Sequence, residues 1–171
     1  MGTGVFFLIA PVGVAGLIPW LLTGWQDHDG WWPLRLVGAL LLGAGGAVLV
    51  VAFARFVTEG SGTPAPIAPT ERLVVGGLYR YVRNPMYLAV VATIVGQALL
   101  LWRADLLAYA GAVLVLFLAF VRGYEEPSLQ DRFGAPFEEY RREVPGWWPR
   151  LCPWDPGERD RGPPPRSDEA P

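Results

Sequence analysis

The stretch GGLYRYVRNPMYLAVV, residues 76–91, marks a boundary between charged and apolar sequence. Within this stretch Arg80 and Arg83 lie before the boundary, and an apolar run begins at Leu88 after it. Asparagine is favoured at the N-cap of a helix and proline at its first position. The pair Asn84-Pro85 therefore predicts that an apolar helix begins here.

Three polar side chains flank this helix start at intervals of four residues: Tyr79, Arg83 and Tyr87. Tyrosine and arginine are common where a membrane meets water. The same residue types can also line a binding site, since an aromatic ring can face a cation. The spacing leaves both interpretations open.

Four apolar stretches predict an all-α integral membrane protein with about four transmembrane helices, at about 4–24, 36–57, 86–102 and 106–121. A bilayer core of ~30 Å needs roughly 17–25 helical residues, so the last two stretches are short. Only 18% of residues are charged, and eight are tryptophan. This composition differs from that of soluble domains, in which about 25% of residues are charged.

Four spans place the N-terminus, the loop 58–85 and the C-terminal region on one side of the membrane. That side carries twelve of the fourteen arginines, and only Arg35 and Arg103 lie on the other. The positive-inside rule then predicts that the arginine-rich side is cytoplasmic. We expect the protein to be integral to the cell (inner) membrane. Tryptophans near the opposite ends of the spans fit an interfacial belt: Trp20, Trp25, Trp31, Trp32 and Trp102.

Small residues at close spacing predict the faces through which the helices pack. The predicted contact residues are Ala39, Gly43 and Ala47 in the second stretch, Ala89, Ala92, Thr93 and Gly96 in the third, and Ala108, Gly111 and Ala112 in the fourth. Gln97 is the strongly polar residue of the third stretch. We expect an interhelical hydrogen bond from it, with a polar cavity as the alternative.

The adjacent acids Glu125 and Glu126 follow the last apolar stretch at the edge of the bilayer. Carboxylates at this depth are costly unless they are paired. One interpretation is that they form ion pairs with Arg80, Arg83 or Arg122. The other is that one of them holds a cationic or polyhydroxyl ligand.

The region after the spans, YEEPSLQDRFGAPFEEYRREVPGWWP at 124–149, predicts two short helices. Ser128 with Asp131 resembles a capping box, Gly134 ends that helix, and a second runs over about 135–143. Its apolar face (Phe137, Tyr140 and Val144) and the following Trp147 and Trp148 predict that it lies in the cytoplasmic interface.

The chain then divides into five parts along its length. These are an N-terminal pair of spans (1–57), a cytoplasmic cofactor loop (58–85), a second pair of spans (86–124), cytoplasmic interfacial helices (125–151) and a disordered tail (152–171). A single cysteine and a single histidine argue against a metal site. The absence of a long basic stripe argues against a nucleic-acid partner.

Residues 72–91 and 124–149 together resemble the isoprenylcysteine carboxyl methyltransferase family of integral-membrane methyltransferases, which is related to phospholipid methyltransferases. The resemblance implies a cytoplasm-facing site for S-adenosylmethionine and a lipophilic acceptor reached from the bilayer. The cofactor-binding residues that it implies are Leu73, Val74, Tyr79, Asn84, Pro85, Tyr87 and Glu125. Arg122 is the nearest counterpart, offset by one position, of the family's catalytic, substrate-side arginine.

This chain departs from the better-known relatives at Asn84, where they carry histidine. Asparagine keeps hydrogen-bonding capacity and cannot titrate near neutral pH. Methyl transfer from a sulfonium requires orientation and exclusion of water, and no metal. A carboxylate acceptor needs no base, whereas an amine must lose a proton to Glu125, Glu126 or a tyrosine.

The sequence therefore favours carboxyl O-methylation of an isoprenylcysteine-like or other isoprenoid or lipid substrate. N-methylation of a phospholipid or lipid amine is the alternative within enzymes. From another class, the chain would be a non-catalytic membrane module for binding or assembly. The expected partners are a lipophilic or lipidated substrate and membrane lipids.

Overall fold

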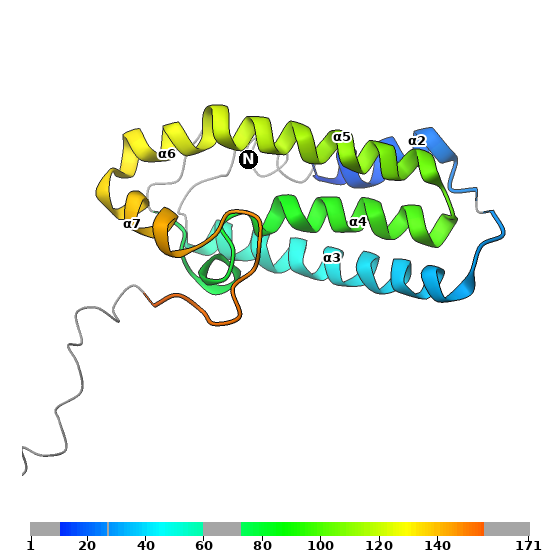
Figure 1. The fold of residues 1–171 in the computed structure, drawn as a ribbon, viewed down its shortest axis with the longest axis horizontal. Coiled ribbons are helices and arrows are strands. Elements are labelled where there is room, and N and C mark those ends of the chain that lie inside the picture. Colours follow the sequence, from blue (N-terminus) through cyan, green and yellow to red (C-terminus); the bar gives the residue numbers. More distant parts are fainter. Residues whose placement is uncertain (1–10, 27, 60–72, 156–171) are drawn as a thin grey trace, which may run out of the picture.

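The computed structural model describes residues 11–26, 28–59 and 73–155, and the regular secondary structure in this part of the chain is all helical, with no strand. The predicted start of the first span, most of the loop and nearly all of the tail lie outside the described residues. Helices α3, α4 and α5 run side by side as an elongated bundle, and α2 lies beside them (Figure 1). Helices α6 and α7 lie at one end of this bundle (Figure 1).

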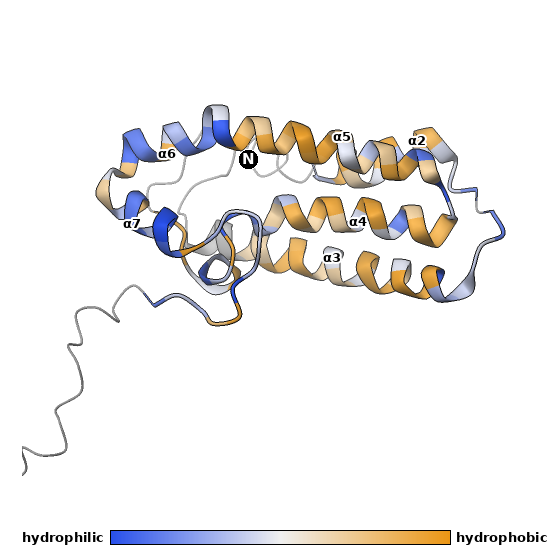
Figure 2. Cartoon of the chain, in the orientation of Figure 1, coloured by the Kyte–Doolittle hydropathy of each residue, from blue (hydrophilic) through white to orange (hydrophobic). Residues whose placement is uncertain are grey.

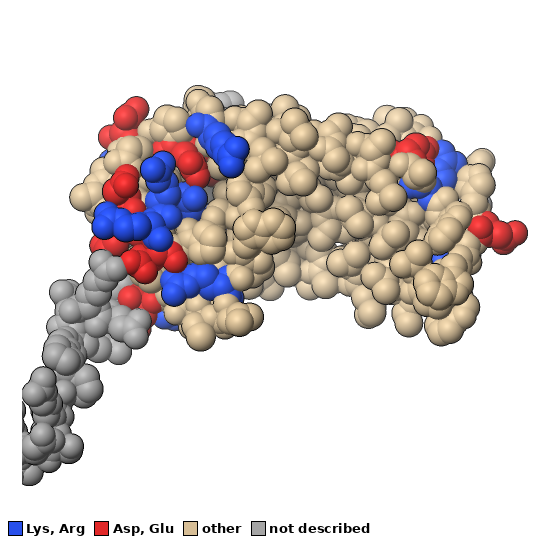
Figure 3. Space-filling view, viewed as in Figure 1, with Lys and Arg blue, Asp and Glu red and all other residues tan. Residues whose placement is uncertain are grey.

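The bundle separates apolar from charged sequence along its length. Apolar residues dominate α3, α4 and α5, and hydrophilic residues gather in α6 and α7 (Figure 2). On the surface, charged side chains are crowded at that end, with a few more at the opposite end (Figure 3). The uncharged middle has the pattern expected of a protein that crosses a bilayer.

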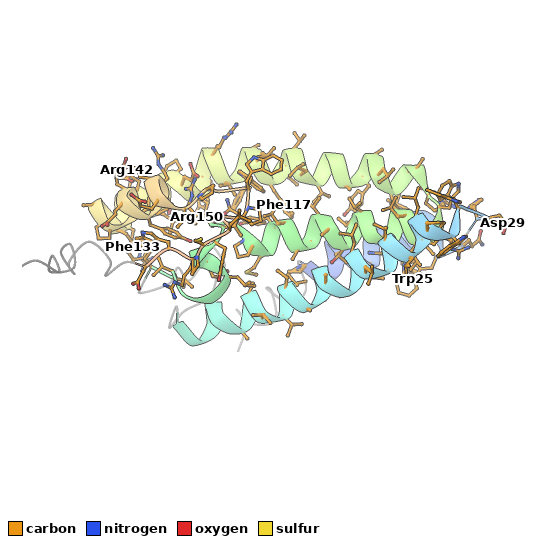
Figure 4. All side chains as sticks on the ribbon, turned by 60° about the horizontal axis from the view of Figure 1, so that its bottom comes forward. Trp25, Asp29, Phe117, Phe133, Arg142 and Arg150 are labelled. Carbon is orange, nitrogen blue, oxygen red and sulfur yellow. The ribbon has the colours of Figure 1, made fainter. Side chains whose placement is uncertain are left out.

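Two helices of the described part are long and apolar enough to cross a membrane, at Trp32–Ala52 and Ala104–Phe133. The other two apolar helices, Gly13–Thr23 and Pro85–Leu101, are shorter. Two of the four predicted spans therefore meet the criterion of length, and the four-span arrangement stays a prediction. Trp25 and Asp29 lie at the end of the bundle opposite to Arg142 and Arg150 (Figure 4).

The first apolar segment changes its helical register next to a proline. After Pro11 and Val12, which are α-helical, it forms a π-helix, Gly13–Leu17, and continues as α2, Ile18–Thr23. The Ile18 N–H donates to the carbonyl of Gly13, five residues back. In the same register the carbonyl of Val14 would pair with Pro19, which has no N–H to donate.

Side chains from two other helices satisfy the carbonyls that Pro19 leaves without a donor. The Tyr109 hydroxyl donates to the Val14 carbonyl at 2.9 Å. Gln97 Nε2 donates to the Ala15 carbonyl, four residues before the proline, at 2.6 Å. The interhelical hydrogen bond predicted for Gln97 is confirmed. In hydrocarbon an unpaired backbone carbonyl is costly, so these bonds stabilise the segment against α4 and α5.

Helices α3 (Trp32–Glu59) and α4 (Pro85–Leu101) approach each other through glycines. A Cβ added to Gly96 would lie 2.6 Å from the backbone nitrogen of Leu42, and one added to Gly38 would lie 2.6 Å from that of Leu100. Gly45 is similarly close to Thr93 Oγ1, at 2.6 Å. Only glycine permits such close backbone contact between the two helices.

The small residues predicted to pack are right on α4 and wrong on two other helices. Ala89, Thr93 and Gly96 are buried, as predicted, and Ala92 is half-buried. The stripe Ala39, Gly43 and Ala47 is exposed, because α3 turns Gly38 and Gly45 toward α4 instead. The residues Ala108, Gly111 and Ala112 of α5 are also exposed, since α5 packs through Leu106, Ala110 and Val113.

Helix α5 (Ala104–Phe120) continues without a break into a π-helical turn, Val121–Glu125, and then into α6, Glu126–Phe133. The predicted helix start at Ser128 is therefore wrong, because Ser128 lies inside α6 and no side chain caps this helix. Gly134, with a φ of 57°, ends α6 as predicted. The next helix, α7, spans Ala135–Glu143.

The apolar face of α7 is covered by protein. Phe137, Tyr140 and Val144 form a buried cluster, against which Leu73, Val75, Leu129, Phe133 and Trp154 pack. The predicted apolar face is thus confirmed, but it contacts other parts of the chain and not a lipid surface. We call the assembly of α6, α7 and the following residues 144–155 the cap.

Candidate functional site

The site begins where α4 begins. A short 3₁₀ turn, Gly77–Arg80, leads to Asn84, and Pro85 occupies the first turn of α4. Helix α4 therefore starts as predicted. Asn84 nevertheless makes no side-chain capping bond. Its backbone carbonyl accepts from the Leu88 N–H at 3.2 Å, and the side chain is free for another role.

The first turn of α4 contacts the π-helical turn after α5 through two side chains. The Tyr87 hydroxyl donates to Glu125 Oε2 at 2.7 Å. Both side chains are largely removed from water. π-Helical turns inside longer helices often occur at functional sites, and this one contains Glu125.

The neighbouring acid has a different environment. Arg83 Nη1 lies 2.8 Å from Glu126 Oε1, and the two side chains are only 15% and 19% exposed. Arg141 of α7 lies 3.9 Å from the other oxygen of Glu126. The pairing interpretation is therefore confirmed for Glu126, whose charge is matched by two arginines. Glu125 has no cation within ion-pair distance among the described residues.

Burial governs the ionisation of Glu125, which follows the apolar part of α5. Desolvation raises the pKa of its carboxyl above the ordinary value of 4.5, and the nearby charge of Glu126 acts in the same direction. The hydrogen bond from Tyr87 and the charge of Arg83 oppose this rise. A cation bound beside Glu125 would balance the negative charge of its carboxylate.

Residues 144–155 form the last part of the cap, and we call them the strap. The strap pairs with the segment that precedes α4. The Arg83 N–H donates to the Pro145 carbonyl at 3.0 Å, the Arg150 N–H to the Tyr81 carbonyl at 2.9 Å, and the Trp154 N–H to the Arg80 carbonyl at 2.9 Å. The strap therefore follows the segment before α4 along its length.

A buried tyrosine adds a further bond between the cap and this segment. The Tyr140 hydroxyl donates to the Tyr79 carbonyl at 2.7 Å. Desolvation raises the pKa of the Tyr140 hydroxyl, so it stays protonated and continues to donate this bond. Tyr79 is itself buried, and its carbonyl holds α7 in place below the site.

Two donors in the site have no hydrogen-bond partner within the described part of the protein. They are Asn84 Nδ2 and Arg83 Nε, and both atoms are buried. Buried polar atoms normally have a partner, so a ligand is a physical explanation for these two. Gly146 of the strap lies against the same two side chains: a Cβ there would be 3.2 Å from Arg83 Nη2 and 3.3 Å from Asn84 Nδ2.

Aromatic rings complete the wall around Tyr87. The ring of Phe117 lies 4.7 Å from that of Tyr87, centroid to centroid, and the ring of Trp147 lies 6.4 Å away, inclined by 28° to that of Tyr87. Phe117, Trp147 and Gly146 were not among the predicted site residues. The dipeptide Trp147-Trp148 signalled a membrane surface in the sequence, and nothing in it distinguished the ring that faces the site.

The structure brings four of the predicted site residues together, and a fifth, the buried Tyr79, is close enough to Tyr87 to interact with it electrostatically. Asn84, Pro85, Tyr87 and Glu125 lie around the start of α4. Leu73 packs against the cluster under α7, and Val74 is buried. Arg122 is exposed, and it forms no ion pair with any described residue. No group of His, Cys, Asp or Glu side chains in the described ranges has the arrangement of a metal site.

Comparison with known proteins identifies the family. The family model for phospholipid methyltransferases matches residues 34–136, which is more than half of the chain. The chain is also 32% identical over 66 residues to a phosphatidylethanolamine N-methyltransferase from Phaeosphaeria nodorum, covering 39% of this chain and 7% of that protein. No solved structure matches.

The match contains α4, the π-helical turn and Glu125, which carry the site. It falls on phospholipid methyltransferases and not on the isoprenylcysteine carboxyl methyltransferases that the sequence resembles, although the two groups are related. The chain belongs to the phospholipid methyltransferase family, a family of membrane-associated methyltransferases.

Proposed function

We propose that this protein transfers a methyl group from S-adenosylmethionine to the amine of a phospholipid headgroup. The observation that carries the proposal is the environment of Glu125. It is a largely desolvated carboxylate whose hydrogen-bond partner is the neutral hydroxyl of Tyr87, and no described cation pairs with it. A site of this kind attracts cations, and an ammonium headgroup is a cation.

The comparisons support the same choice of acceptor. The sequence alone favours carboxyl O-methylation, with lipid-amine methylation as the alternative. The family match and the similarity to a phosphatidylethanolamine N-methyltransferase fit the alternative better. A carboxylate acceptor would also approach Glu125 as a like charge, which is unfavourable in a desolvated site.

The residues around α4 fit S-adenosylmethionine as the donor. The unpartnered Asn84 Nδ2 and Arg83 Nε can donate to its carboxylate or to acceptors on its adenosine part. Glu125 can accept from its ammonium group or its ribose hydroxyls. When bound, S-adenosylmethionine supplies a methyl group on a positively charged sulfur. The rings of Tyr87 and Trp147 can face that charge.

The acceptor amine must lose a proton before it can react, and Tyr87 and Glu125 are arranged to accept one. The ammonium proton passes to the Tyr87 oxygen as the Tyr87 proton passes along the 2.7 Å hydrogen bond to Glu125. The raised pKa of Glu125 makes its carboxylate a better proton acceptor. Glu126 is held by Arg83 and is not needed for this step.

We also propose that the site faces the cytoplasm, since the arginine-rich end of the chain contains it. A cysteine replacing Asp29 in a Cys152→Ser background should react with an impermeant thiol reagent in intact cells. Native Cys152, at the other end, should not. The opposite pattern of labelling would reverse the orientation.

The substrate class is tested by the chemistry of the product. Purified protein in nanodiscs that contain phosphatidylethanolamine and an isoprenylcysteine analogue is supplied with methyl-labelled S-adenosylmethionine. We expect label in N-methylated phosphatidylethanolamine, which survives mild alkali. Label confined to an alkali-labile methyl ester would favour carboxyl methylation instead. Binding of S-adenosylmethionine without transfer to any lipid would favour a non-catalytic module.

A further inference from the structure

The strap carries two large apolar side chains that face away from the protein, those of Trp148 and Leu151. Trp147 turns toward Tyr87 in the site, with its ring 6.4 Å away. The next residue, Trp148, is 80% exposed, and Leu151 is 100% exposed. Pro149, which lies between them in sequence, and Cys152, which follows Leu151, are exposed as well. We call residues 148–152 the strap tip.

Hydrogen bonds on both sides hold this tip in a defined position. The Arg150 N–H donates to the Tyr81 carbonyl at 2.9 Å, and Arg150 Nη1 donates to the Glu143 carbonyl at 2.8 Å. Trp154 fixes the following residues through its bond to Arg80. The exposed apolar surface therefore belongs to a fixed part of the fold, and such surface usually marks a contact site.

The strap meets the bundle at the edge of its apolar part. The Pro145 carbonyl of the strap accepts from the backbone N–H of Arg83, which lies two residues before Pro85, where α4 begins. Because an extended chain spans at most ~3.6 Å per residue, these two positions differ by no more than about 7 Å in depth. The polar headgroup layer on each side of a bilayer is roughly 5–8 Å thick. The strap thus begins in or next to the headgroup layer.

We propose that the strap tip inserts Trp148 and Leu151 into the headgroup layer of the membrane. Lipid is the occupant that fits, because tryptophan prefers this depth and the tip adjoins the apolar end of the bundle. The apolar face of α7 is already covered by protein, so the tip is the part of the cap left to contact lipid. Insertion would also hold Trp147, on the opposite side of the strap, against Tyr87 in the site.

The single cysteine of the chain provides a native probe. Cys152 is exposed and follows Leu151 directly. The full-length protein, labelled there with the environment-sensitive dye NBD, is placed in nanodiscs of phosphatidylcholine and phosphatidylglycerol. We expect a blue-shifted emission, strong quenching by lipids with a nitroxide near the headgroup, and several-fold protection from aqueous iodide.

A label at Asp131 in a Cys152→Ser background is the matched control, because Asp131 is exposed on α6 at the same end of the molecule. We expect it to stay accessible to iodide. Replacing Trp148 and Leu151 together by Gln should restore iodide access at Cys152, and S-adenosylmethionine affinity in detergent should remain.

Two results would overturn the proposal. If the Cys152 label is as accessible to iodide as the Asp131 label and lipid does not quench it, the tip lies in water. If the label is protected from iodide but not quenched by lipid, protein covers the tip and lipid does not. Neither measurement depends on methyl transfer, so its outcome is separate from that of the proposed function.

Discussion

The Tyr87 hydroxyl donates a 2.7 Å hydrogen bond to Glu125 Oε2, and this contact joins the first turn of α4 to the π-helical turn after α5. Thirty-eight residues separate the two in sequence. The next residue, Glu126, is paired with Arg83 at 2.8 Å. Two adjacent carboxylates therefore have different partners, one neutral and one cationic, and this difference assigns them different roles.

Replacing each acid by its amide should separate these roles. Glu126→Gln leaves the largely buried Arg83 without its partner, so we expect a loss of about 1–3 kcal/mol in the free energy of unfolding, between the values for exposed and buried ion pairs. Glu125→Gln should change stability little and weaken S-adenosylmethionine binding by ~1.5–3 kcal/mol, the value of a charge-assisted hydrogen bond.

Thermal unfolding and calorimetric binding in detergent measure both quantities for the two variants. Equal effects of the two changes on S-adenosylmethionine affinity would contradict the assignment. So would a large loss of stability in Glu125→Gln that matches the loss in Glu126→Gln.

The affinity for S-adenosylmethionine should depend on pH through Glu125. Burial raises the pKa of its carboxyl above the ordinary 4.5, so the carboxylate becomes protonated at a higher pH than usual. A cationic ligand prefers the ionised form. Affinity should therefore fall as pH falls through this raised pKa, by at most about tenfold per pH unit. Titrations across acidic and neutral pH measure the change.

The Glu125→Gln variant is the control for this titration, because an amide does not ionise. Its weaker affinity should be nearly flat over the same range. An equally steep decline in that variant would show that another group controls the pH dependence.

Asn84 should matter for binding more than for stability. Its side chain does not cap α4, and its buried Nδ2 has no partner among the described residues. We therefore expect Asn84→Ser to keep the melting temperature close to that of the native protein. The shorter hydroxyl cannot reach the same ligand atom, so S-adenosylmethionine binding should weaken by about 1 kcal/mol or more.

Asn84→His tests whether the site is equivalent to that of relatives that carry histidine, and it should retain near-normal affinity. An unchanged affinity in Asn84→Ser would remove Asn84 from the site.

The glycine contacts between α3 and α4 give a prediction about the scaffold. In Gly96→Ala the new Cβ would meet the backbone of Leu42 at 2.6 Å, so the helices must separate. We expect destabilisation of about 1–3 kcal/mol, typical of overpacking. Gly43→Ala is the matched control, since a Cβ there meets nothing within 4 Å. Chemical unfolding in detergent compares the two variants.

The control should be neutral or slightly more stable, because alanine favours helices by up to ~1 kcal/mol over glycine. A destabilised Gly43→Ala would mean that the second stretch packs through its other small-residue face.

The helices themselves could be predicted from the sequence because hydropathy and helix-start residues are local signals. The apolar stretches, the start of α4 at Pro85 and the end of α6 at Gly134 all follow from neighbouring residues. The packing faces could not be predicted in the same way. Glycine and alanine are so frequent in α3 that several faces fit a four-residue spacing, and only the contact with α4 selects Gly38 and Gly45.

The site was predictable in part for a similar reason. The residues Asn84, Tyr87 and Glu125 stood out by pattern, and the structure brings them to one end of α4. The difference between Glu125 and Glu126 depends on the π-helical turn Val121–Glu125, which changes the helical register between α5 and α6. The contact of Gly146 with the unpartnered amide of Asn84 depends on the strap, which lies about sixty residues later in the chain.

In the proposed function, Glu125 acts with Tyr87 in methyl transfer to a lipid amine. The most direct measurement is the rate at which native protein, Glu125→Gln and Asp131→Asn transfer labelled methyl to phosphatidylethanolamine in nanodiscs at saturating S-adenosylmethionine. We predict native rates for Asp131→Asn, which changes an exposed acid, and a loss of about 10²–10⁴-fold for Glu125→Gln, the usual contribution of a positioned proton acceptor. Transfer by Glu125→Gln at the native rate would contradict the account.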